Sequence, residues 1–498
     1  MTQSAPDLTR LSREGGTVFL LPLEGVPTLT CSEIVRRVPG RRLVCRGEWN
    51  GQAVFAKLFI GHQAGRYAER DARGIHALMA GHLLTPALLH AGKISGQPGQ
   101  VLIFAAVPDS RNAELVWQTA DSSQRGLLAA ELVNTVAKHH AAGLLQTDLY
   151  LRNFLCDGSG IHTLDGDGIR IYRRPVRRWR SLANLALLLS KFDVEEDVFI
   201  PELVHAYAKQ RGWPLKQCDL HVVQKNVQTI RRRIARQYAE RKVLRECTDV
   251  HVEHRFGRFL AVTREKMSHA LRLVTDGPDA WLDGAGCVRL KNGNTCTVGL
   301  VEADGQHIVI KRYNIKNVWH GTNRMLRRTR ASISWSNAHR LRMFGIPTPA
   351  PLALIEHRYG PLRKESYFLA EYVAGPNIDE VLADPVVTDE SKQAIAQQAA
   401  GLLHKLYLLG IEHGDMKATN LKIVDGKLML LDLDAMRQHR FMWWFRRRHA
   451  RDLRRFLRNW QDNPVMLRML QNALATAYGS DPVIGMTGVS GQETSEKK

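Results

Sequence analysis

The sequence predicts an α+β protein made of two copies of one bilobal domain, in which a β-rich N-lobe precedes a helical C-lobe. Three observations support this fold class. The chain has 498 residues, 44% of them hydrophobic, which suffices for two or three domains that each bury a core. A set of polar residues recurs at a constant separation along the chain. Each copy of this set follows an apolar, β-prone run that ends in a lysine.

The most regular part of the repeat is an Asp-x-x-x-x-Asn motif, followed twelve residues after the asparagine by an aspartate. Four polar matches at one separation indicate an internal duplication. The matched pairs, each 267 residues apart, are Asp148 and Asp415, Asn153 and Asn420, Asp165 and Asp432, and Arg170 and Arg437.

The upstream part of each copy predicts the β-rich lobe. Lys57 and Lys311 each end an apolar run that follows a turn signal, Asn50-Gly51 in the first copy and Asp304-Gly305 in the second. A helical stretch, a Thr-Pro pair and two further strand-like runs then follow in both copies. The two lysines are 254 residues apart, so the loops differ in length while the order of elements is kept.

The duplication sets the expected domain boundaries. A break in the pattern at Asp276-Gly277-Pro278 places the joint between the copies near residues 262–280. The final residues are rich in Gly, Ser, Thr and charge and are expected to be disordered. The predicted segments are a first domain at residues 1–262 (N-lobe about 25–108, C-lobe about 109–262), a second domain at 263–478 (N-lobe about 281–375, C-lobe about 376–478) and a disordered tail at 479–498.

Composition narrows the function classes. Lys and Arg number 70 against 49 Asp and Glu, and the net charge of +21 favours a polyanionic partner such as nucleic acid or a phosphorylated surface. No apolar stretch approaches the roughly 20 residues that span a bilayer, and the first residues lack the pattern of a secretion signal. Seven scattered cysteines form no Cys-x-x-Cys pair. These observations disfavour secreted, transmembrane and zinc-ribbon proteins and predict a cytoplasmic globular protein.

Each copy carries the residue types that phosphoryl transfer from ATP requires. A cation must hold the negative nucleotide phosphates, an amide oxygen and a carboxylate suit Mg²⁺, and another carboxylate must orient the acceptor hydroxyl and take its proton. The Asp-x-x-x-x-Asn spacing and the later aspartate resemble the catalytic loop and metal-binding motif of protein kinases. The expected fold is therefore a tandem duplication of a bilobal protein-kinase-like fold.

Departures from the protein-kinase pattern point to one family. The metal-binding motif reads Asp165-Gly-Asp and Asp432-Leu-Asp instead of Asp-Phe-Gly, neither half has a convincing Gly-x-Gly-x-x-Gly, and no Ala-Pro-Glu follows. The run Val-Ile-Lys-Arg-Tyr-Asn at residues 309–314 and the segment at 335–349, which begins Trp-Ser-Asn-Ala-His and ends Gly-Ile-Pro-Thr-Pro, complete the pattern. These features resemble the Kdo/WaaP lipopolysaccharide kinase family, including its InaA-like members. The resemblance covers nearly the whole chain, as two tandem family domains.

The resemblance implies cofactors, a substrate and residue roles. Members of this family phosphorylate sugars, typically heptose or Kdo, of the lipopolysaccharide inner core at the cytoplasmic side of the membrane. ATP and Mg²⁺ are therefore the implied cofactors, and the lipopolysaccharide core or a lipid-linked precursor is the implied partner. By position, Lys57 with its expected helix partner Glu69, and Lys311, would bind the nucleotide phosphates. The other implied roles are catalysis by Asp148 and Asp415 and Mg²⁺ coordination by Asn153, Asp165, Asn420 and Asp432.

The two halves differ in the residues that support these roles. In the first half, Glu69 follows Lys57 by twelve residues. In the second half, no acidic residue lies between Lys311 and Gly345, and Asn337 or Ser336 takes the place of the acid. The catalytic loop shows the opposite bias. At the position that braces the loop, the second half has His413 and the first half has Gln146. At the position that would face the transferring phosphate, the second half has Lys417 and the first half has Tyr150. Both halves are expected to bind nucleotide and at least one to transfer phosphate, with the first slightly favoured by its Lys–Glu pair.

A basic and aromatic segment at residues 441–460 offers a further partner. Its Leu453, Phe456, Leu457 and Trp460 recur at helical spacing, with arginines on the other faces. The apolar stripe is either core of the second C-lobe or a surface for peripheral contact with an anionic membrane.

Three other functions stay open. A protein Ser/Thr kinase is disfavoured by the missing Ala-Pro-Glu motif. A nucleotide-binding pseudokinase that scaffolds assembly of the lipopolysaccharide core would explain the imperfect supporting residues in both halves. Nucleic-acid binding is allowed by the charge, but no recognisable module supports it, so no nucleic-acid partner is expected. The expected location is cytoplasmic, with the inner face of the cytoplasmic membrane as a place of peripheral contact.

Overall fold

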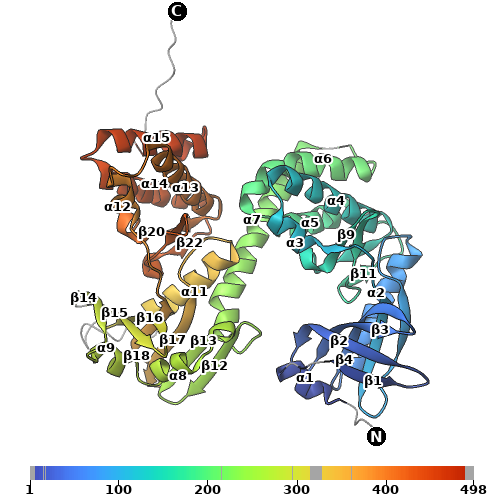
Figure 1. Cartoon of the computed structure of the whole chain (residues 1–498). Coiled ribbons are helices and arrows are strands. Elements are labelled where there is room, and N and C mark those ends of the chain that lie inside the picture. Colours follow the sequence, from blue (N-terminus) through green and yellow to red (C-terminus); the bar gives the residue numbers. More distant parts are fainter. Residues whose placement is uncertain are drawn as a thin grey trace, which may run out of the picture. The chain divides into compact units, whose positions relative to one another are not determined.

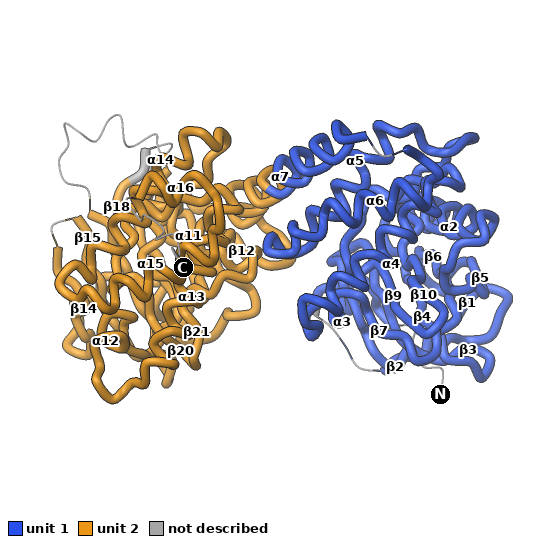
Figure 2. Tube along the Cα trace, turned by 90° about the horizontal axis from the view of Figure 1, so that it is seen from above, with its two compact units in different colours: residues 1–231 blue, residues 232–498 orange. Residues whose placement is uncertain are grey.

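The computed structural model forms two compact units, residues 1–231 and residues 232–498 (Figure 2). Within each unit, a β-sheet and a helical region can be followed in Figure 1. The structure describes residues 6–487 except Gly15, Thr17, Leu215, Asn294, 315–327, Gly360 and Pro361.

The first unit begins with a six-stranded antiparallel sheet. In sheet order, its strands are β1 (Phe19–Leu23), β2 (Val26–Val38), β3 (Arg42–Trp49), β4 (Gln52–Ile60), β6 (Gly99–Ala105) and β5 (Leu88–Lys93). Helix α1 (Leu8–Glu14) adds the fully buried Leu8 to the core on one face. Helix α2 (Ala64–Ala80) packs against β6 through Ala64, Ala68, Ile75 and Leu78, whose spacing of three, four or seven residues places them on one side of the helix.

The helical region of the first unit is built around α4, which begins at a capping box between Asp121 and Gln124. Its Leu128, Leu132 and Val136 recur every four residues and are buried. The helices of this region are α3 (Ala113–Thr119), α4 (Ser122–Ala141), α5 (Arg178–Leu189), α6 (Ile200–Gln210) and α7 (Gln217–Glu240). The short strands are β7 (Arg111–Asn112), β8 (Leu144–Gln146), β9 (Phe154–Asp157), β10 (Gly160–Thr163) and β11 (Ile169–Ile171), and the 3₁₀ turns are Leu151–Asn153 and Val194–Phe199.

The second unit contains a seven-stranded antiparallel sheet. In sheet order, its strands are β12 (Val250–Arg255), β13 (Arg258–Thr263), β17 (Pro351–Tyr359), β18 (Leu362–Glu371), β16 (Gln306–Tyr313), β15 (Cys296–Ala303) and β14 (Val288–Gly293). The helices that accompany it are α8 (His269–Asp276), α9 (Pro278–Asp283) and α11 (Arg330–Met343), with 3₁₀ turns at Lys242–Leu244 and Arg264–Lys266. Trp335 of α11 is fully buried, and its indole N–H donates to the Val243 carbonyl at 2.9 Å.

The helical region of the second unit follows the sheet. Its helices are α12 (Ile378–Ala383), α13 (Asp389–Leu408), α14 (Met442–Leu457), α15 (Pro464–Tyr478) and α16 (Pro482–Gly485). Its short strands are β19 (Ile411–Glu412), β20 (Leu421–Val424), β21 (Lys427–Leu430) and β22 (Arg437–Gln438), and its 3₁₀ turns are Ala418–Asn420, Leu433–Ala435 and Arg458–Trp460. Leu453, Phe456 and Leu457 of α14 and Trp460 just after it are buried, so the predicted apolar stripe is core of the second unit.

Five strands occur in the same order in both sheets. The order β2-β3-β4-β6-β5 of the first unit corresponds to β14-β15-β16-β18-β17 of the second. Lys57 lies on β4 and Lys311 on the corresponding strand β16, and a helix (α2 or α11) precedes the next strand in each unit.

The boundary between the units lies within helix α7 and not near residue 262. Residues 232–262 belong to the second unit, since β13 pairs with β17 from Arg258 opposite His357 to Val262 opposite Ala353. The sequence break at Gly277-Pro278 is the start of α9, because proline fits the first turn of a helix, where its missing N–H has no helical partner.

Residues 479–487, which were expected to be part of a disordered tail, are ordered. Residues 482–485 form α16, in which Val483 is fully buried. The Tyr407 hydroxyl donates to Asp481 at 2.9 Å, which attaches this segment to α13. Residues 488–498 lie outside the described residues.

Candidate active site

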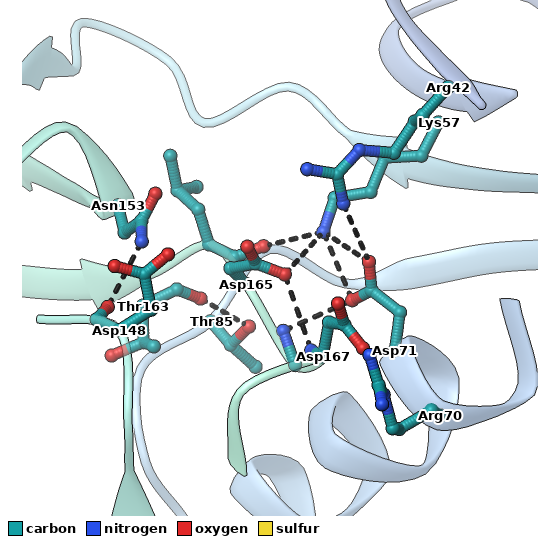
Figure 3. Close-up of polar contacts among 12 residues, drawn as sticks. Arg42, Lys57, Arg70, Asp71, Thr85, Asp148, Asn153, Thr163, Asp165 and Asp167 are labelled. Atoms are coloured by element: carbon teal, nitrogen blue, oxygen red, sulfur yellow. Dashed lines mark hydrogen bonds and ion pairs between the residues drawn. The ribbon is translucent and has the colours of Figure 1, made fainter. Parts of the chain in front are cut away.

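Lys57 lies among carboxylates in the first unit (Figure 3). Its Nζ donates to Asp71 Oδ1 and Oδ2 at 3.0 and 2.7 Å and to the Leu164 carbonyl at 3.0 Å. Asp165 Oδ1 is 3.6 Å from the same Nζ. Strand β4 supplies the lysine, α2 supplies Asp71, and the segment after β10 supplies Asp165. The predicted pair Lys57 and Asp165 is therefore brought together.

The helix partner of Lys57 is Asp71, and the expected partner Glu69 is an exposed residue on another face of α2. Two residues turn a helix by about 200°, so both side chains cannot face the sheet. Asp71 is fully buried and also accepts a hydrogen bond from the Gly166 N–H at 3.0 Å. Its place on the apolar side of α2, between Ala68 and Ile75, is the sequence signal that identifies it.

The ion pairs around Lys57 set the charge of both aspartates. Burial raises the pKa of Asp71 above its usual range, although Lys57 counteracts part of that effect. Burial also raises the pKa of Asp165, but Lys57 and Arg42 outweigh it, so this carboxyl ends below its usual range. Asp165 is therefore charged at neutral pH, as a cation ligand must be.

Two arginines of the β2–β3 hairpin extend the cationic side of the first site. Arg42 Nη1 lies 4.0 Å from Asp71 Oδ2. Burial lowers the pKa of Arg36, as do Arg152 and Arg42, while Asp165 acts in the opposite direction. The turn of this hairpin is held beside the end of β4, because the Ile60 N–H donates to the Arg41 carbonyl at 3.0 Å. Sequence reasoning missed both arginines, since no glycine-rich motif identifies the hairpin.

The Asp-x-x-x-x-Asn loop of the first unit holds its asparagine and aspartate together. Asn153 Nδ2 donates to the Asp148 carbonyl at 3.0 Å, and Asn153 is buried (Figure 3). Gln146 occupies the bracing position and is also buried, and among the described residues neither polar atom of its side chain has a hydrogen-bond partner. Its carbonyl accepts a hydrogen bond from Asn184 Nδ2 of α5 at 2.8 Å.

Lys191, which follows α5, brings a cation to this loop. Its Nζ lies 3.7 Å from the ring centroid of Tyr150, the residue that replaces the loop lysine. Burial lowers the pKa of Lys191 to about 8, with Asp148 opposing and Arg152 adding to the shift. The tandem repeat could not reveal this lysine, because it lies outside the repeated motif.

In the second unit, Lys311 pairs with both aspartates of the Asp-Leu-Asp motif. Its Nζ donates to Asp432 Oδ1 and lies 3.3 Å from Asp434 Oδ2. Burial raises the pKa of Asp432, but Lys311 outweighs that effect and the net pKa is lowered. Arg330, at the start of α11, adds an ion pair to Asp434 at 2.7 Å. In the first unit Arg70 of α2 pairs with Asp167, the corresponding second aspartate.

Asn337 takes the place of the missing helix acid, as the sequence indicates. Its Nδ2 donates to the Leu433 and Met436 carbonyls at 2.9 and 3.1 Å. Asp71 contacts the corresponding segment of the first unit through Gly166. Both side chains therefore tie the helix to the metal-binding motif, but only the aspartate also reaches the lysine.

The catalytic loop of the second unit is braced on two sides. His413 is fully buried, its Nε2 bonds the Leu431 carbonyl at 3.0 Å and its Nδ1 accepts from the Asp415 N–H at 3.3 Å. The buried carboxylate of Asp452 on α14 accepts from the N–H groups of His413 at 2.8 Å and Gly414 at 3.1 Å. These contacts fix the backbone that presents Asp415.

Two cations and the loop asparagine surround Asp415. Lys417 Nζ lies 3.4 Å from Asp415 Oδ1, and Arg455 of α14 pairs with the same oxygen. Asn420 Nδ2 donates to the Asp415 carbonyl at 2.8 Å, the contact that Asn153 makes in the first unit. Sequence reasoning missed Arg455 because it lies on a helix forty residues after the loop.

A cavity of about 360 Å³ lies between the sheet and the helical region of the second unit. Its polar lining includes Lys311, Asn420 and Asp432, together with Lys291 and Lys422. Its apolar lining includes Val298, Val309, Phe368 and Leu431. A largely apolar cavity that also presents cations, an amide and a carboxylate suits an aromatic base that carries phosphates.

The donor set of this cavity fits Mg²⁺. The amide oxygen of Asn420 and the carboxylate of Asp432 are hard oxygen ligands, and Mg²⁺ is usually held by one or two carboxylates together with substrate phosphates and water. Over the described ranges, no group of three or more His, Cys, Asp and Glu side chains forms a complete metal cage.

Among the helices of the described residues, none is long and apolar enough to cross a bilayer. The comparison with curated proteins gave no match. Residues 279–478 match the model of the lipopolysaccharide kinase (Kdo/WaaP) family. The match contains Lys311, the braced loop at Asp415 and the Asp432 motif. Over residues 279–478, the chain therefore matches the Kdo/WaaP lipopolysaccharide kinase family.

Proposed function

We propose that the protein is an ATP- and Mg²⁺-dependent kinase that phosphorylates a sugar hydroxyl, of heptose or Kdo, in the lipopolysaccharide inner core. The observation that carries this proposal is the cavity of the second unit, where Lys311, Asn420 and Asp432 meet beside the loop of Asp415. The substrate would be the core itself or a lipid-linked precursor, which places the reaction in the cytoplasm at the inner face of the membrane. No nucleic-acid partner is part of the proposal.

Each residue of the second unit has a physical role in this proposal. Lys311 would hold nucleotide phosphates, and Asn420 with Asp432 would hold Mg²⁺, which neutralises charge on the phosphates when bound. Asp415 would accept the proton of the sugar hydroxyl. Lys417 and Arg455, both beside Asp415, would compensate negative charge on the transferring phosphoryl group and the acceptor.

We further propose that the chain is a tandem duplication and that the first unit is a second kinase-like domain. The common order of five strands and the two equivalent Asn–Asp contacts support the duplication. Lys57, Asp148, Asn153 and Asp165 would then be the nucleotide, catalytic and metal residues of the first unit. The braced loop of the second unit favours that unit for phosphoryl transfer, which reverses the preference drawn from the Lys–Glu pair.

A second candidate function for the first unit is nucleotide binding without transfer, as a scaffold for core assembly. The buried Gln146, which braces nothing with its side chain, favours this alternative. A protein Ser/Thr kinase would be supported by phosphate transfer to a protein and not to glycan.

The test is the phosphate content of core oligosaccharide from cells that lack the protein, measured by mass spectrometry. We expect core oligosaccharide from these cells to lack one phosphate. Expression of the wild-type protein, of Asp148→Ala or of the exposed control Asp462→Ala should restore this phosphate, whereas expression of Asp415→Ala should not. Restoration by Asp415→Ala with failure of Asp148→Ala would assign transfer to the first unit. An unchanged phosphate count in all strains, or full rescue by the Asp148→Ala, Asp415→Ala double variant, would refute the kinase proposal.

A further inference from the structure

The start of helix α14 exposes large aromatic side chains in a strongly basic setting. Phe441, Trp443 and Trp444 are 61%, 64% and 43% exposed. We call these three residues, together with Arg440, Arg447 and Arg448, the aromatic–basic surface. Exposed tryptophans that form a group on a protein surface usually mark a site of interaction, because each leaves apolar area in water.

Each aromatic ring of this surface lies close to one of its arginines. The guanidinium groups lie 5.6, 6.0 and 5.5 Å from the ring centroids in the pairs Arg440–Phe441, Arg447–Trp443 and Arg448–Trp444. The last two pairs have the i, i+4 spacing that places side chains together on a helix. The rings and the charges therefore form one surface.

The opposite side of α14 is fixed in the core. Phe445, His449, Leu453 and Phe456 are buried, and buried Asp452 holds the catalytic loop. Packing within the unit thus accounts for the whole predicted apolar stripe, and it leaves the aromatic residues at the start of α14 without a role. The exposed rings are not an edge of the core.

The surface has one sign of charge. Residues 437–451 contain six arginines and no acidic residue. Arg448 Nη1 lies 3.8 Å from Oε1 of the buried Glu412. Residues 439–451 contain no Ser, Thr, Asn or Gln, so arginine and histidine supply the polar side chains of this segment.

The first unit also exposes a tryptophan beside an arginine, at the start of helix α5. Trp179, at the start of α5, is 64% exposed, and Ile171 before it is 51% exposed. The Arg180 guanidinium lies 4.9 Å from the Trp179 ring. Helix α5 corresponds to α14, because each supports its catalytic loop through a buried polar residue, Asn184 or Asp452.

We propose that the aromatic–basic surface binds an anionic lipid bilayer, with its tryptophans in the interface and its arginines on lipid phosphates. Indole rings favour the boundary between headgroups and acyl chains, and a helix that combines them with arginines binds membranes that carry negative charge. The inference goes beyond the kinase proposal and does not require catalysis. It gives α14 two functions, since the helix that presents these rings also carries Arg455 to Asp415.

The test measures binding of the full-length protein to vesicles of 70% phosphatidylcholine and 30% phosphatidylglycerol, by co-sedimentation without nucleotide. Vesicles of phosphatidylcholine alone are the charge control. For Trp443→Ser with Trp444→Ser we expect a loss of about tenfold or more in the partition coefficient, because burial of each ring is lost. For Arg440→Ser with Arg447→Ser we expect a loss of about 25-fold at low salt, about fivefold for each arginine.

The matched control is Phe256→Ser, which removes an aromatic ring that is 81% exposed at the β12–β13 turn. This variant, and Asp415→Ala, should bind vesicles like wild type, so failure of the kinase proposal would leave the membrane result intact. Circular dichroism verifies that every variant is folded. Equal binding to both vesicle types, or wild-type binding by the tryptophan double variant, would overturn the proposal. If the tryptophan and arginine double variants lost binding to an oligonucleotide but kept wild-type binding to vesicles, the membrane proposal would be overturned in favour of nucleic acid.

Discussion

Replacement of Asp71 by alanine should destabilise the first unit strongly, whereas replacement of Glu69 should have little effect. Asp71 makes two hydrogen bonds to Lys57 and one to the Gly166 N–H, all in a position with no solvent exposure. Its removal leaves the Lys57 ammonium, only 12% exposed, without its helix partner. Glu69 is exposed two residues earlier on the same helix.

The magnitude follows from the residues that remain. Breaking a buried ion pair by removal of one partner costs about 3–5 kcal/mol. Asp165 stays 3.6 Å from Lys57 and compensates part of the charge, which favours the lower end, about 3 kcal/mol. For a unit of 231 residues, this corresponds to a decrease in Tm of about 9 °C. A substitution at the exposed Glu69 should stay within about 0.5 kcal/mol.

Hydrogen exchange with mass spectrometry on the full chain separates the two units, because it reports each peptide. For Asp71→Ala we expect faster exchange in α2 and in the segment around Gly166, with the second unit unchanged. Asp71→Asn is the matched variant, since it keeps the shape and reproduces the residue type found at Asn337. The reasoning fails if Glu69→Ala is as damaging as Asp71→Ala, or if Asp71→Ala leaves exchange in α2 at the wild-type rate.

Three further outcomes are expected. Burial lowers the pKa of His449 to about 3, so below pH 6.5 the unfolded chain takes up a proton that the folded chain does not, and stability falls as the pH decreases from 6.5 toward 3. Urea titrations at pH 5 to 7 give the slope of the unfolding free energy against pH, and in His449→Gln this slope should decrease by up to about 1.4 kcal/mol per pH unit. An unchanged slope contradicts the lowered pKa of His449. His413→Gln gives the second loop the residue of the first and removes two contacts, so it should cost about 1–2 kcal/mol and slow phosphoryl transfer about tenfold or more, while a wild-type rate would show that the brace is dispensable. Lys191, with its pKa at about 8, should react with an acylating reagent at pH 7.5 about tenfold faster than the average lysine, as peptide mass spectrometry would measure, and a rate at or below that average contradicts the lowered pKa.

The repeated motif indicated the Asp-x-x-x-x-Asn loop and the later aspartate in both units, because the chain between them has the same length in each. Asp148 and Asn153 are in contact, as are Asp415 and Asn420, although their roles stay proposals. The partner of Lys57 was assigned wrongly because its distance along the chain depends on where α2 begins, which sequence alone leaves uncertain. Helical periodicity could have corrected this, since Asp71 and not Glu69 lies on the buried side.

Residues contributed by remote elements could not be predicted. Arg455 reaches Asp415 from α14, and Lys191 reaches Tyr150 from the end of α5, so neither has a fixed spacing from the motif. The domain boundary was misplaced for another reason. Strands β12 and β13 are an addition to the second sheet that has no counterpart in the first, so self-comparison of the sequence could not reveal it.

Helix α7 gives the two units a shared element where a flexible linker would be expected. Val223 and Val227 belong to the core of the first unit, and Tyr238 packs into a core cluster of the second. A fragment that starts at residue 263 would lose β12, β13 and this end of α7, and would leave the edge of β17 open to pairing with other chains. A cut inside α7 would remove buried side chains from one half or the other. Neither unit can therefore be excised with a clean end, and a chain reduced to one unit would need new residues to cover the surface that the cut exposes.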